Sequence, residues 1–587
     1  MDKDQIGEIF IKIATLLELK GENPFKSRAY HNAARALETL NEPLDNVISE
    51  NRLGQIKGIG ESLQKKIAEM LTTGKLAYYE ELKASTPSGL VAMLDIPGLG
   101  PKKIKALHDE LGVETVEQLE QACKDGKVAG LTGFGEKTQT HILEGIHRRR
   151  DYASRYLISE ALAIAEPLLE SLRSHPDVIR CSTAGSLRRH REVIGDIDLL
   201  ASSKKAADVI EFFAGQAGIL NVIAKGETRA SALMKGGIQS DLRVVSDAEF
   251  PFALQYFTGS KEHNIAMRQR AIACGLWLNE YGLFRSRSET RDPKLLIRCQ
   301  TEEEIFEKLG LHYIPPEMRE DLGEIPLAEE GPLARLVEWT DLKGSLHNHS
   351  TWSDGHQSPK EIAESMRELG LAYWAITDHS KASFQANGLD AARVRQQLRE
   401  IKEINTRLAK EGSDFRLLTG TEVDILTDGR LDFPDDLLAE LDVVIASIHQ
   451  SFSQSEAETT KRLVGATQNR YVHMLGHLTG RLLLEREPYK VDQRAVIDAC
   501  AETGTWIELN AFPVRLDMDW RLWPYAKSKG VKCVINCDAH RLEHTGFLRL
   551  GVGIARKGWL EKGDVINTLP LDKLVKELQK KRARPAG

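Results

Sequence analysis

Nine side chains that can bind a metal ion recur through the carboxy-terminal part of this sequence. They follow short β-rich runs and come in the order His347, His349, Asp354, His379, Glu422, His449, His477, Asp538 and His540. Nitrogen and oxygen ligands without cysteine suit Zn²⁺, Mn²⁺ or Fe²⁺ at a hydrolytic centre, and not a closed structural zinc site. One histidine after a strand is more often structural, but nine such residues indicate a metal centre.

Helical stretches separate these runs, for example at residues 358–370 and 390–404. Strands that alternate with helices, with polar residues at the carboxyl ends of the strands, are typical of a TIM-like barrel. Active sites of such barrels lie at that same end. We therefore expect an α/β barrel with a metal site at one end.

A second group of carboxylates lies upstream in the chain. Asp196 and Asp198 alternate within an apolar run, so a strand would place both on one face, and Asp241 heads another β-rich run. Three carboxylates on neighbouring strands can hold two Mg²⁺ ions for phosphoryl transfer. A small-residue turn and guanidinium groups suited to a triphosphate come before them, at Gly185, Ser186, Arg188 and Arg189.

The amino-terminal part contains a weak internal repeat. Three segments share a Gly-apolar-Gly core followed by apolar residues at helical spacing, at Gly58 and Gly60, Gly98 and Gly100, and Gly133 and Gly135. Such a pair lets the backbone turn into a helix whose free N–H groups can bind a DNA phosphate without reading bases. One copy would indicate only a capping turn, whereas three copies favour DNA binding. Lysines that would meet the same phosphates follow at Lys65, Lys66, Lys102 and Lys103.

With these motifs, residues 1–315 resemble the family X DNA polymerases, the group that includes polymerase beta. The glycine repeats resemble helix-hairpin-helix modules, and the segments YFTGSKEHN and YIPPEMRE match the same family. The resemblance implies that Asp196, Asp198 and Asp241 bind catalytic Mg²⁺ or Mn²⁺. It also implies that the nucleotide phosphates are contacted by Gly185, Ser186 and Arg189. The sugar pocket would be lined by Tyr256, Phe257 and Gly259. The nascent base pair and template would be contacted by Asn264 and Arg268.

Two positions need separate treatment. Polymerase beta has an arginine two residues before its third aspartate, where this chain has Gln239, so the contact with the primer terminus stays open. Lys66 matches the lysine that forms a Schiff base with an abasic sugar in the lyase domain of this family. That chemistry needs a partly deprotonated amine, favoured by desolvation or by cations such as Lys65. The alternative is that Lys66 only binds a phosphate.

Residues 341–575 resemble the PHP (polymerase and histidinol phosphatase) domain. The resemblance implies that the nine ligands hold three metal ions, Zn²⁺ or Mn²⁺ or also Fe²⁺, in a distorted barrel of seven strand-helix units. It further implies that water activated there attacks a phosphorus atom. Because every ligand position is filled by a competent residue, we expect an active hydrolase.

The expected fold is multidomain: a helix-hairpin-helix amino-terminal part, an α+β nucleotidyltransferase-like palm and thumb, and a distorted TIM-like (βα)7 barrel. We expect a helical DNA-binding and lyase-like domain over residues 1–85, a helix-hairpin-helix fingers-type domain over 86–150 and a palm with the catalytic aspartates over 151–255. These are followed by a thumb-type nucleotide-selection domain over 256–315, a linker over 316–340 and the PHP domain over 341–587. The linker follows from clustered prolines, acidic residues and the lack of a sustained period.

Composition limits the class of protein. The 587 residues are 41% hydrophobic and 28% charged, which is globular and neither collagenous nor disordered. We see no apolar run of membrane length, no secretory signal and no CxxC pair among the seven cysteines, so we expect a cytoplasmic protein with reduced thiols. The combination of the two halves resembles the bacterial two-domain family X polymerases, which implies a bacterial, nucleoid-associated protein. Since the net charge is −7, a DNA-binding surface must be a local patch.

These features predict a monomeric, gap-filling DNA polymerase of base-excision repair with a metal-dependent 3′–5′ exonuclease or end-processing activity in its PHP domain. The expected partners are gapped or nicked DNA and deoxynucleoside triphosphates, without a membrane. Abasic-site lyase and endonuclease activities stay open. The alternative is a PHP phosphoesterase whose front half is only a DNA-binding scaffold; intact Asp196, Asp198 and Asp241 argue against it.

Overall fold

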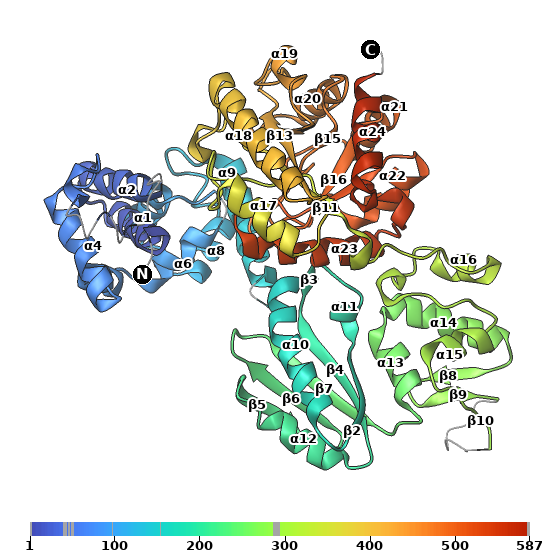
Figure 1. Ribbon diagram of the computed structural model, residues 1–587. Coiled ribbons are helices and arrows are strands. Elements are labelled where there is room, and N and C mark those ends of the chain that lie inside the picture. The colour runs from blue at the N-terminus through green and yellow to red at the C-terminus, as the bar shows by residue number, and fades with distance from the viewer. Residues whose placement is uncertain are drawn as a thin grey trace. The chain divides into compact units, whose positions relative to one another are not determined.

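The computed structural model describes residues 3–38, 44, 47, 52–96, 98–152, 154–285 and 294–583. The chain forms two compact units, Met1–Ser154 and Arg155–Gly587, and each is described by itself (Figure 1). Among the described residues, no helix has the length and apolar character needed to cross a membrane. The seven cysteines are all described and all free.

The first unit is helical in its described part. Its α-helices are α1 (Lys3–Leu19), α2 (Pro24–Glu38), α4 (Glu61–Thr73), α5 (Ala77–Ala84), α6 (Ser88–Ala92), α7 (Pro101–Leu111), α8 (Val116–Lys124) and α9 (Gly135–Tyr152). Its hydrophobic core joins fully buried residues of α1, such as Phe10 and Ile13, to Ile67 of α4 and Ile104 of α7. Apolar residues at helical spacing therefore supply this core, as in an amphipathic helix.

The three glycine repeats begin α4, α7 and α9, as the spacing predicted. Gly60 and Gly100 are the N-cap residues of α4 and α7, while Gly58 and Gly98 have φ of 103° and 83°. A positive φ is a conformation that glycine adopts without steric cost, so the first glycine of each pair permits the turn. The third repeat differs, because Gly135 itself has φ of 77°.

A five-stranded mixed sheet carries the three aspartates of the second unit. Its strand order is β2-β4-β7-β6-β5, with β4 parallel to β7. The strands are β2 (Val178–Thr183), β4 (Asp196–Ser203), β5 (Ile219–Lys225), β6 (Arg229–Met234) and β7 (Gln239–Val245). Helices α10 (Ile158–Ser174) and α12 (Ala206–Ala214) pack on one face of the sheet (Figure 1).

The opposite face of this sheet meets helix α13 (Phe250–Thr258). Leu200 of β4 packs there against Phe250 and Leu254, whereas Leu199 belongs to the core beneath α10 and α12. Because side chains alternate along a strand, Asp198 lies on the same face as Leu200. The aspartates therefore lie on the face of the sheet that meets α13.

A smaller antiparallel sheet follows, with strand order β10-β9-β8. Its elements are β8 (Trp277–Asn279), β9 (Gly282–Phe284), β10 (Leu296–Ile297), α14 (Lys261–Ala273) and α15 (Glu302–Lys308). Buried Phe252, Met267 and Phe306 join α13, α14 and α15 in one hydrophobic core. This region thus packs around α13, the helix that also contacts the aspartate-bearing sheet.

The segment 316–340, expected from the sequence to be a linker without regular structure, contains helix α16 (Glu324–Glu330) and buried charges. Arg319 is fully buried and lies 2.6 Å from Glu302, and Glu324 lies 2.7 Å from His263 Nδ1. Farther along, the Val337 N–H donates to the Leu560 carbonyl. Ion pairs with residues distant in the sequence hold this segment, and hydrophobic periodicity does not report such pairs.

A seven-stranded, wholly parallel sheet forms the carboxy-terminal part, in the order β11-β12-β13-β14-β15-β16-β17. The strands are β11 (Gly344–Ser345), β12 (Tyr373–Ile376), β13 (Arg416–Asp424), β14 (Val443–Ser447), β15 (Met474–Leu475), β16 (Trp506–Asn510) and β17 (Cys533–Asn536). Helices surround these strands (Figure 1). The predicted barrel-like alternation of strands and helices is confirmed.

Parallel strands that are buried on both faces are mostly apolar. Strands β12, β14, β16 and β17 are buried along their whole length. The long helices that separate or follow these strands are α17 (Pro359–Glu368), α18 (Ala391–Lys410), α20 (Glu456–Thr467), α21 (Gln493–Thr503) and α23 (Leu548–Lys557). Ser358 and Ser455 form capping boxes at the starts of α17 and α20. Helix α24 (Leu571–Arg582) packs Leu574 and Leu578 against inward-facing strand residues such as Tyr373 and Ile445.

Helix α23 approaches the sheet too closely for a side chain at Gly551. A Cβ there would lie 2.6 Å from Ile535 and 2.7 Å from Ala511, on β17 and just beyond β16. We expect Gly551→Ala to destabilise the fold by about 1–3 kcal/mol despite the better helix propensity of alanine. Denaturant unfolding checks this, with Gly563→Ala as the control because a Cβ at Gly563 meets nothing within 4 Å. Equal unfolding midpoints for both variants would contradict the packing argument.

Candidate metal centres and nucleotide site

The metal-binding residues predicted from the sequence lie at the carboxyl ends of the barrel strands or in the loops that follow. His347, His379, His449 and His477 follow the ends of β11, β12, β14 and β15 within three residues, and Glu422 lies near the end of β13. Asp538 and His540 follow β17. Because the strands are parallel, these ends converge on one rim. His477 and Asp538 have φ of 22° and 50°, a conformation that non-glycine residues adopt rarely and chiefly at functional sites.

Glu422 is the centre of this cluster. Its Oε1 lies 2.9 Å from His477 Nε2 and 3.1 Å from His449 Nε2. Its Oε2 lies 3.0 Å from His379 Nδ1 and 3.3 Å from His347 Nε2. Burial by itself raises the pKa of Glu422, but the neighbouring imidazoles, above all His449, lower it well below the usual value. The carboxylate is therefore a buried anion among potential metal ligands.

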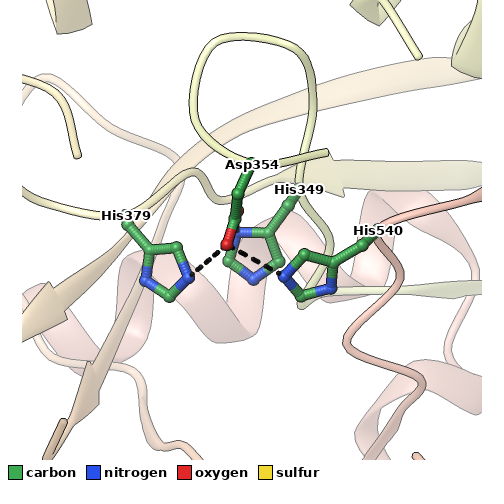
Figure 2. Close-up of side chains that lie close together, drawn as sticks. All are labelled: His349, Asp354, His379 and His540. Carbon is green, nitrogen blue, oxygen red and sulfur yellow. Dashed lines mark ion pairs between the residues drawn. The ribbon is translucent and has the colours of Figure 1, made fainter. Parts of the chain in front are cut away.

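Asp354 joins a second part of the cluster, which Figure 2 shows. Its Oδ2 lies 3.6 Å from His379 Nε2 and 3.4 Å from His540 Nε2, and its Oδ1 lies 3.7 Å from His349 Nδ1. The His349 ring stacks between those of His379 and His540, with centroids 4.4 and 4.3 Å away. One ligand atom from each of these four residues lies within 4.8 Å of the others.

The donor set fits metal ions better than it fits hydrogen bonding. Within the described residues, the buried atoms Glu422 Oε1 and Oε2, His347 Nε2 and His349 Nδ1 have no partner in hydrogen-bonding geometry. Buried polar atoms without partners cost free energy, and a cation among them would offset that cost. Asp538 completes the set, with Oδ1 3.1 Å from His349 Nε2. The structure thus brings all nine predicted ligands together.

Several residues that sequence analysis did not single out surround these ligands. Glu508 of β16 is fully buried and its Oε1 lies 2.6 Å from His347 Nδ1, while Asp424 Oδ1 lies 3.2 Å from His449 Nδ1. Each fixes the ring nitrogen that faces away from Glu422. Arg515 Nε lies 3.7 Å from Asp538 Oδ2, beside the cluster. The pattern that predicted the ligands was a polar residue after a strand. Glu508 and Asp424 lie inside strands, so this pattern did not identify them.

The three aspartates of the mixed sheet also converge. Asp198 and Asp241 are direct register partners of β4 and β7, and ligand oxygens of both and of Asp196 lie within 4.8 Å of one another. Burial, followed by the charges of Asp196 and Asp241, raises the pKa of Asp198 to about 7. Mutual repulsion of three carboxylates is relieved by a bound cation. The site is therefore suited to divalent metal ions.

Gln239, the residue that departs from polymerase beta, contributes to this site. Its Nε2 donates to Asp241 Oδ2 at 2.8 Å, and Arg229 Nη2 lies 3.2 Å from Asp241 Oδ1. The Ser231 hydroxyl also donates to Asp241 Oδ1. Gln239 thus orients an aspartate in this structure.

The turn that begins at Gly185 contacts the aspartates directly. Gly185 has φ of 57°, and a Cβ there would overlap the Asp198 carboxylate, so only glycine fits. Ser186 is the next residue of the short helix α11 (Gly185–Arg188). Arg188 Nη2 lies 2.6 Å from Glu302 Oε2, and Arg189 Nε lies 3.0 Å from Glu320 Oε1. Both arginines are therefore held in position by buried acids.

The segment expected to form the sugar pocket lies at the end of α13. Phe257 lines one cavity together with Asp198, Asp241 and Arg243, and its ring stands edge-on to Tyr256 with centroids 5.2 Å apart. Gly259 is the C-cap residue of α13, with φ of 69°. The Asn264 amide donates to the Tyr256 carbonyl at 2.7 Å. Arg268 Nε donates to the Asn264 carbonyl on exposed α14 surface.

In the helical unit, the predicted lysines lie beyond the glycine turns. Lys65 is exposed and lies 3.2 Å from Glu61, and Lys102 is exposed on α7. Lys103 Nζ instead donates to the Gly98 carbonyl and so supports the turn. Lys66 Nζ lies 4.6 Å from the centroid of the Tyr78 ring, a cation–π contact. A Cβ at Gly60, Gly98 or Gly100 would meet nothing within 4 Å, so these turns are open to a ligand.

Comparison with known families agrees with this division. Residues 1–76 match a helix-hairpin-helix domain, and residues 90–148 match a SAM-like helix-hairpin-helix tandem. Residues 253–320 match the DNA polymerase beta thumb, and residues 345–511 match the PHP domain. Each match falls within the part of the chain in which the corresponding motif was recognised, and the PHP match ends before Asp538 and His540.

A relative of full length decides the family. The DNA polymerase/3′-5′ exonuclease PolX of Bacillus subtilis is 41% identical over 573 residues, which cover 97% of this chain and 98% of the relative. The chain belongs to the PolX family. The predicted family X polymerase with a PHP domain is therefore confirmed.

Two further relatives of this PolX chain match its parts. A probable phosphatase of Caldanaerobacter subterraneus is 30% identical over 41% of the chain and 92% of the relative. DNA polymerase lambda of Rattus norvegicus is 23% identical over 52% of the chain and 54% of the relative. The PolX chain thus joins two parts that are also found in separate proteins.

The contact between Glu508 and His347 allows a test of metal binding. Glu508→Gln removes the charge that orients the imidazole and should lower metal affinity about 10- to 100-fold, as other losses of an orienting carboxylate do. Metal content after dialysis against a graded chelator measures this. Glu400→Gln is the matched control, because Glu400 accepts a hydrogen bond from Trp352 Nε1 and touches no ligand. Undiminished affinity in Glu508→Gln would exclude the orienting role.

Proposed function

We propose that the two sites of this PolX chain divide its two activities between them. The chain is a DNA polymerase and a 3′–5′ exonuclease, which follows from its full-length match and its PHP domain. The single observation that carries the division is that two separate clusters of metal-binding side chains occupy two different sheets. A phosphoesterase on an inert DNA-binding scaffold would need no converged Asp196, Asp198 and Asp241.

At the polymerase site, Asp196, Asp198 and Asp241 hold divalent metal ions, for which we propose Mg²⁺ or Mn²⁺ because all the ligands are carboxylates. Gly185, Ser186 and Arg189 receive the triphosphate, and the chain bends closely enough at Gly185 to bring it to Asp198. Tyr256, Phe257 and Gly259 line the sugar pocket. Asn264 and Arg268 lie along the nascent base pair and template.

At the PHP site, the mixed imidazole and carboxylate set favours Zn²⁺ or Mn²⁺, with Fe²⁺ as a further candidate, and we propose three ions for nine ligands. When bound by these residues, metal ions would supply polarisation of phosphoryl oxygens and activation of the attacking group at either site. Glu508 and Asp424 orient the ligand rings of His347 and His449 through their other nitrogens. Arg515, next to Asp538, is placed to receive a substrate phosphate.

The substrates are DNA and deoxynucleoside triphosphates, and we propose gapped or nicked duplexes in base-excision repair as the DNA. The glycine turns of the helical unit would bind its phosphates through backbone N–H groups, with Lys65 and Lys102 close by. We propose the domain limits expected from the sequence, 1–85, 86–150, 151–255, 256–315, 316–340 and 341–587. Both outer limits, residues 1 and 587, fall outside the described residues.

We propose abasic-site lyase activity for Lys66. The contact of its Nζ with the Tyr78 ring holds the amine at one place on the surface of α4. A Schiff base forms when the neutral amine attacks the C1′ aldehyde of the sugar and water leaves. A simple phosphate contact by the same ammonium is the second candidate role.

Separate sites predict separable losses. Asp198→Asn should abolish primer extension at a one-nucleotide gap and leave 3′ hydrolysis, because only one metal site loses a ligand. Asp538→Ala should do the reverse, with gap filling retained. Extension of labelled gapped DNA and digestion of labelled 3′ ends measure both activities in each variant.

The control for the metal dependence is the parent protein. After chelation, added Mn²⁺ should restore its 3′ hydrolysis but not that of Asp538→Ala. Loss of both activities in either single variant would refute the separate-sites proposal.

Lys66→Ala should prevent borohydride trapping of the protein on DNA with a 5′ abasic sugar, because the trapped bond joins the sugar to the lysine amine. Lys83→Ala, which removes an exposed lysine of α5, is the matched control, and it should be trapped like the parent. Undiminished trapping of Lys66→Ala assigns the Schiff base elsewhere and leaves Lys66 as a phosphate contact.

A further inference from the structure

A buried lysine of the PHP part contacts the nucleotide site of the polymerase part. Lys557, the last residue of α23, has a fully buried side chain. Its Nζ lies 2.5 Å from Glu320 Oε1 and donates to the carbonyls of Arg189 and Glu317 at 3.0 and 3.4 Å. An ammonium has three protons to donate, and here three acceptors receive them. All three acceptors come from residues that precede the barrel.

The carboxylate of Glu320 links this lysine to Arg189. Its Oε1 accepts from Lys557 Nζ and from Arg189 Nε, which lies 3.0 Å away. Arg189 Nη1 also donates to the Thr258 carbonyl at 2.6 Å, at the end of α13. Both the backbone and the guanidinium of Arg189 are therefore tied to Lys557, one directly and the other through a shared anion.

The neighbouring contacts hold the same turn without touching the Arg189 guanidinium. Glu192 accepts from Arg481 Nη2 at 3.1 Å and from Trp520 Nε1 at 3.0 Å. A Cβ at Gly553, one turn before Lys557 on α23, would overlap the His190 ring. Arg556 Nε lies 2.6 Å from Glu317 Oε1, so it joins the two parts beside Lys557 but at another acid.

We propose that Lys557 is a positioning residue for nucleotide binding, which acts through Glu320 on Arg189. This rests on the proposed role of Arg189 in binding the triphosphate. With Lys557 present, the carboxylate of Glu320 divides its charge among Lys557, Arg189 and Arg191, whose Nη1 lies 3.6 Å from Glu320 Oε2. Arg189 therefore keeps attraction for an incoming anion. Without the lysine charge, Glu320 pairs more strongly with Arg189, and the backbone carbonyl of Arg189 loses a donor. The barrel is in this way part of the polymerase site.

Lys557→Met tests this, because methionine keeps most of the length of the side chain and removes the charge. The apparent KM for the nucleotide on gapped DNA should rise about tenfold with kcat within about twofold, the pattern of lost substrate binding. The dissociation constant of a non-hydrolysable deoxynucleoside triphosphate, measured by calorimetry with Mg²⁺, should rise equally. Arg556→Met is the matched control, and both constants should stay within about twofold of the parent values.

The 3′ exonuclease activity reports whether each variant is folded, since Lys557 touches no PHP ligand. If Lys557→Met loses it, Glu320→Gln replaces it as the test and should lower the same two constants, because it removes the anion that competes for Arg189. In the Glu320→Gln background, Lys557→Met should raise the constants less than it does alone, since the carboxylate through which it acts is gone.

Unchanged nucleotide affinity in a folded Lys557→Met variant, or an equal rise in Arg556→Met, overturns the proposal. A parent protein that incorporates no nucleotide would instead overturn the proposed function. The dissociation constants would still decide the role of Lys557 in that case, because they need no turnover.

Discussion

The carboxylate of Glu422 is the charge around which the barrel is organised. It is fully buried, and four imidazoles lie within 3.3 Å of it. An isolated buried carboxylate would be expelled or protonated, so its position requires cationic or metal-bound neighbours on every side. Those neighbours come from different strands, and a parallel sheet that curves toward closure brings so many strand ends to one point. Several ligands are needed around Glu422, and this need is met only where several strand ends converge.

The sequence predicted the parts of this arrangement that depend on local pattern. A histidine or carboxylate after each short apolar run indicated the ligands, and Gly-apolar-Gly spacing indicated the starts of α4, α7 and α9. Contacts between distant residues lay outside its reach. Arg319 looked like part of a polar linker because its partner, Glu302, belongs to another element. Glu508 looked like an ordinary strand residue, since only the closed arrangement of strands brings it to His347.

The two catalytic sites solve the same electrostatic problem differently. In the mixed sheet, three carboxylates lie close together, and burial, followed by their mutual repulsion, raises the pKa of Asp198 to about 7. In the barrel, each carboxylate is surrounded by imidazoles, and the pKa of Glu422 and Asp538 is held well below the usual value. An all-oxygen site selects small, hard cations, whereas imidazole favours later transition metals. The ligand chemistry of the two clusters therefore differs, as our proposal of different metal ions requires.

The packed segment 316–340 affects how the polymerase and barrel parts can be expressed as separate fragments. Arg319 and Glu324 are fully buried against the polymerase part, and Val337 is hydrogen-bonded to Leu560 of the barrel part. A fragment that begins at residue 341 would lose the backbone partner of Leu560. A fragment that ends at residue 315 would deprive Glu302 of Arg319 and His263 of Glu324. Expression boundaries drawn through this segment would therefore yield two incomplete surfaces. The segment is thus a structural part of both surfaces and not a connection between two independent ones.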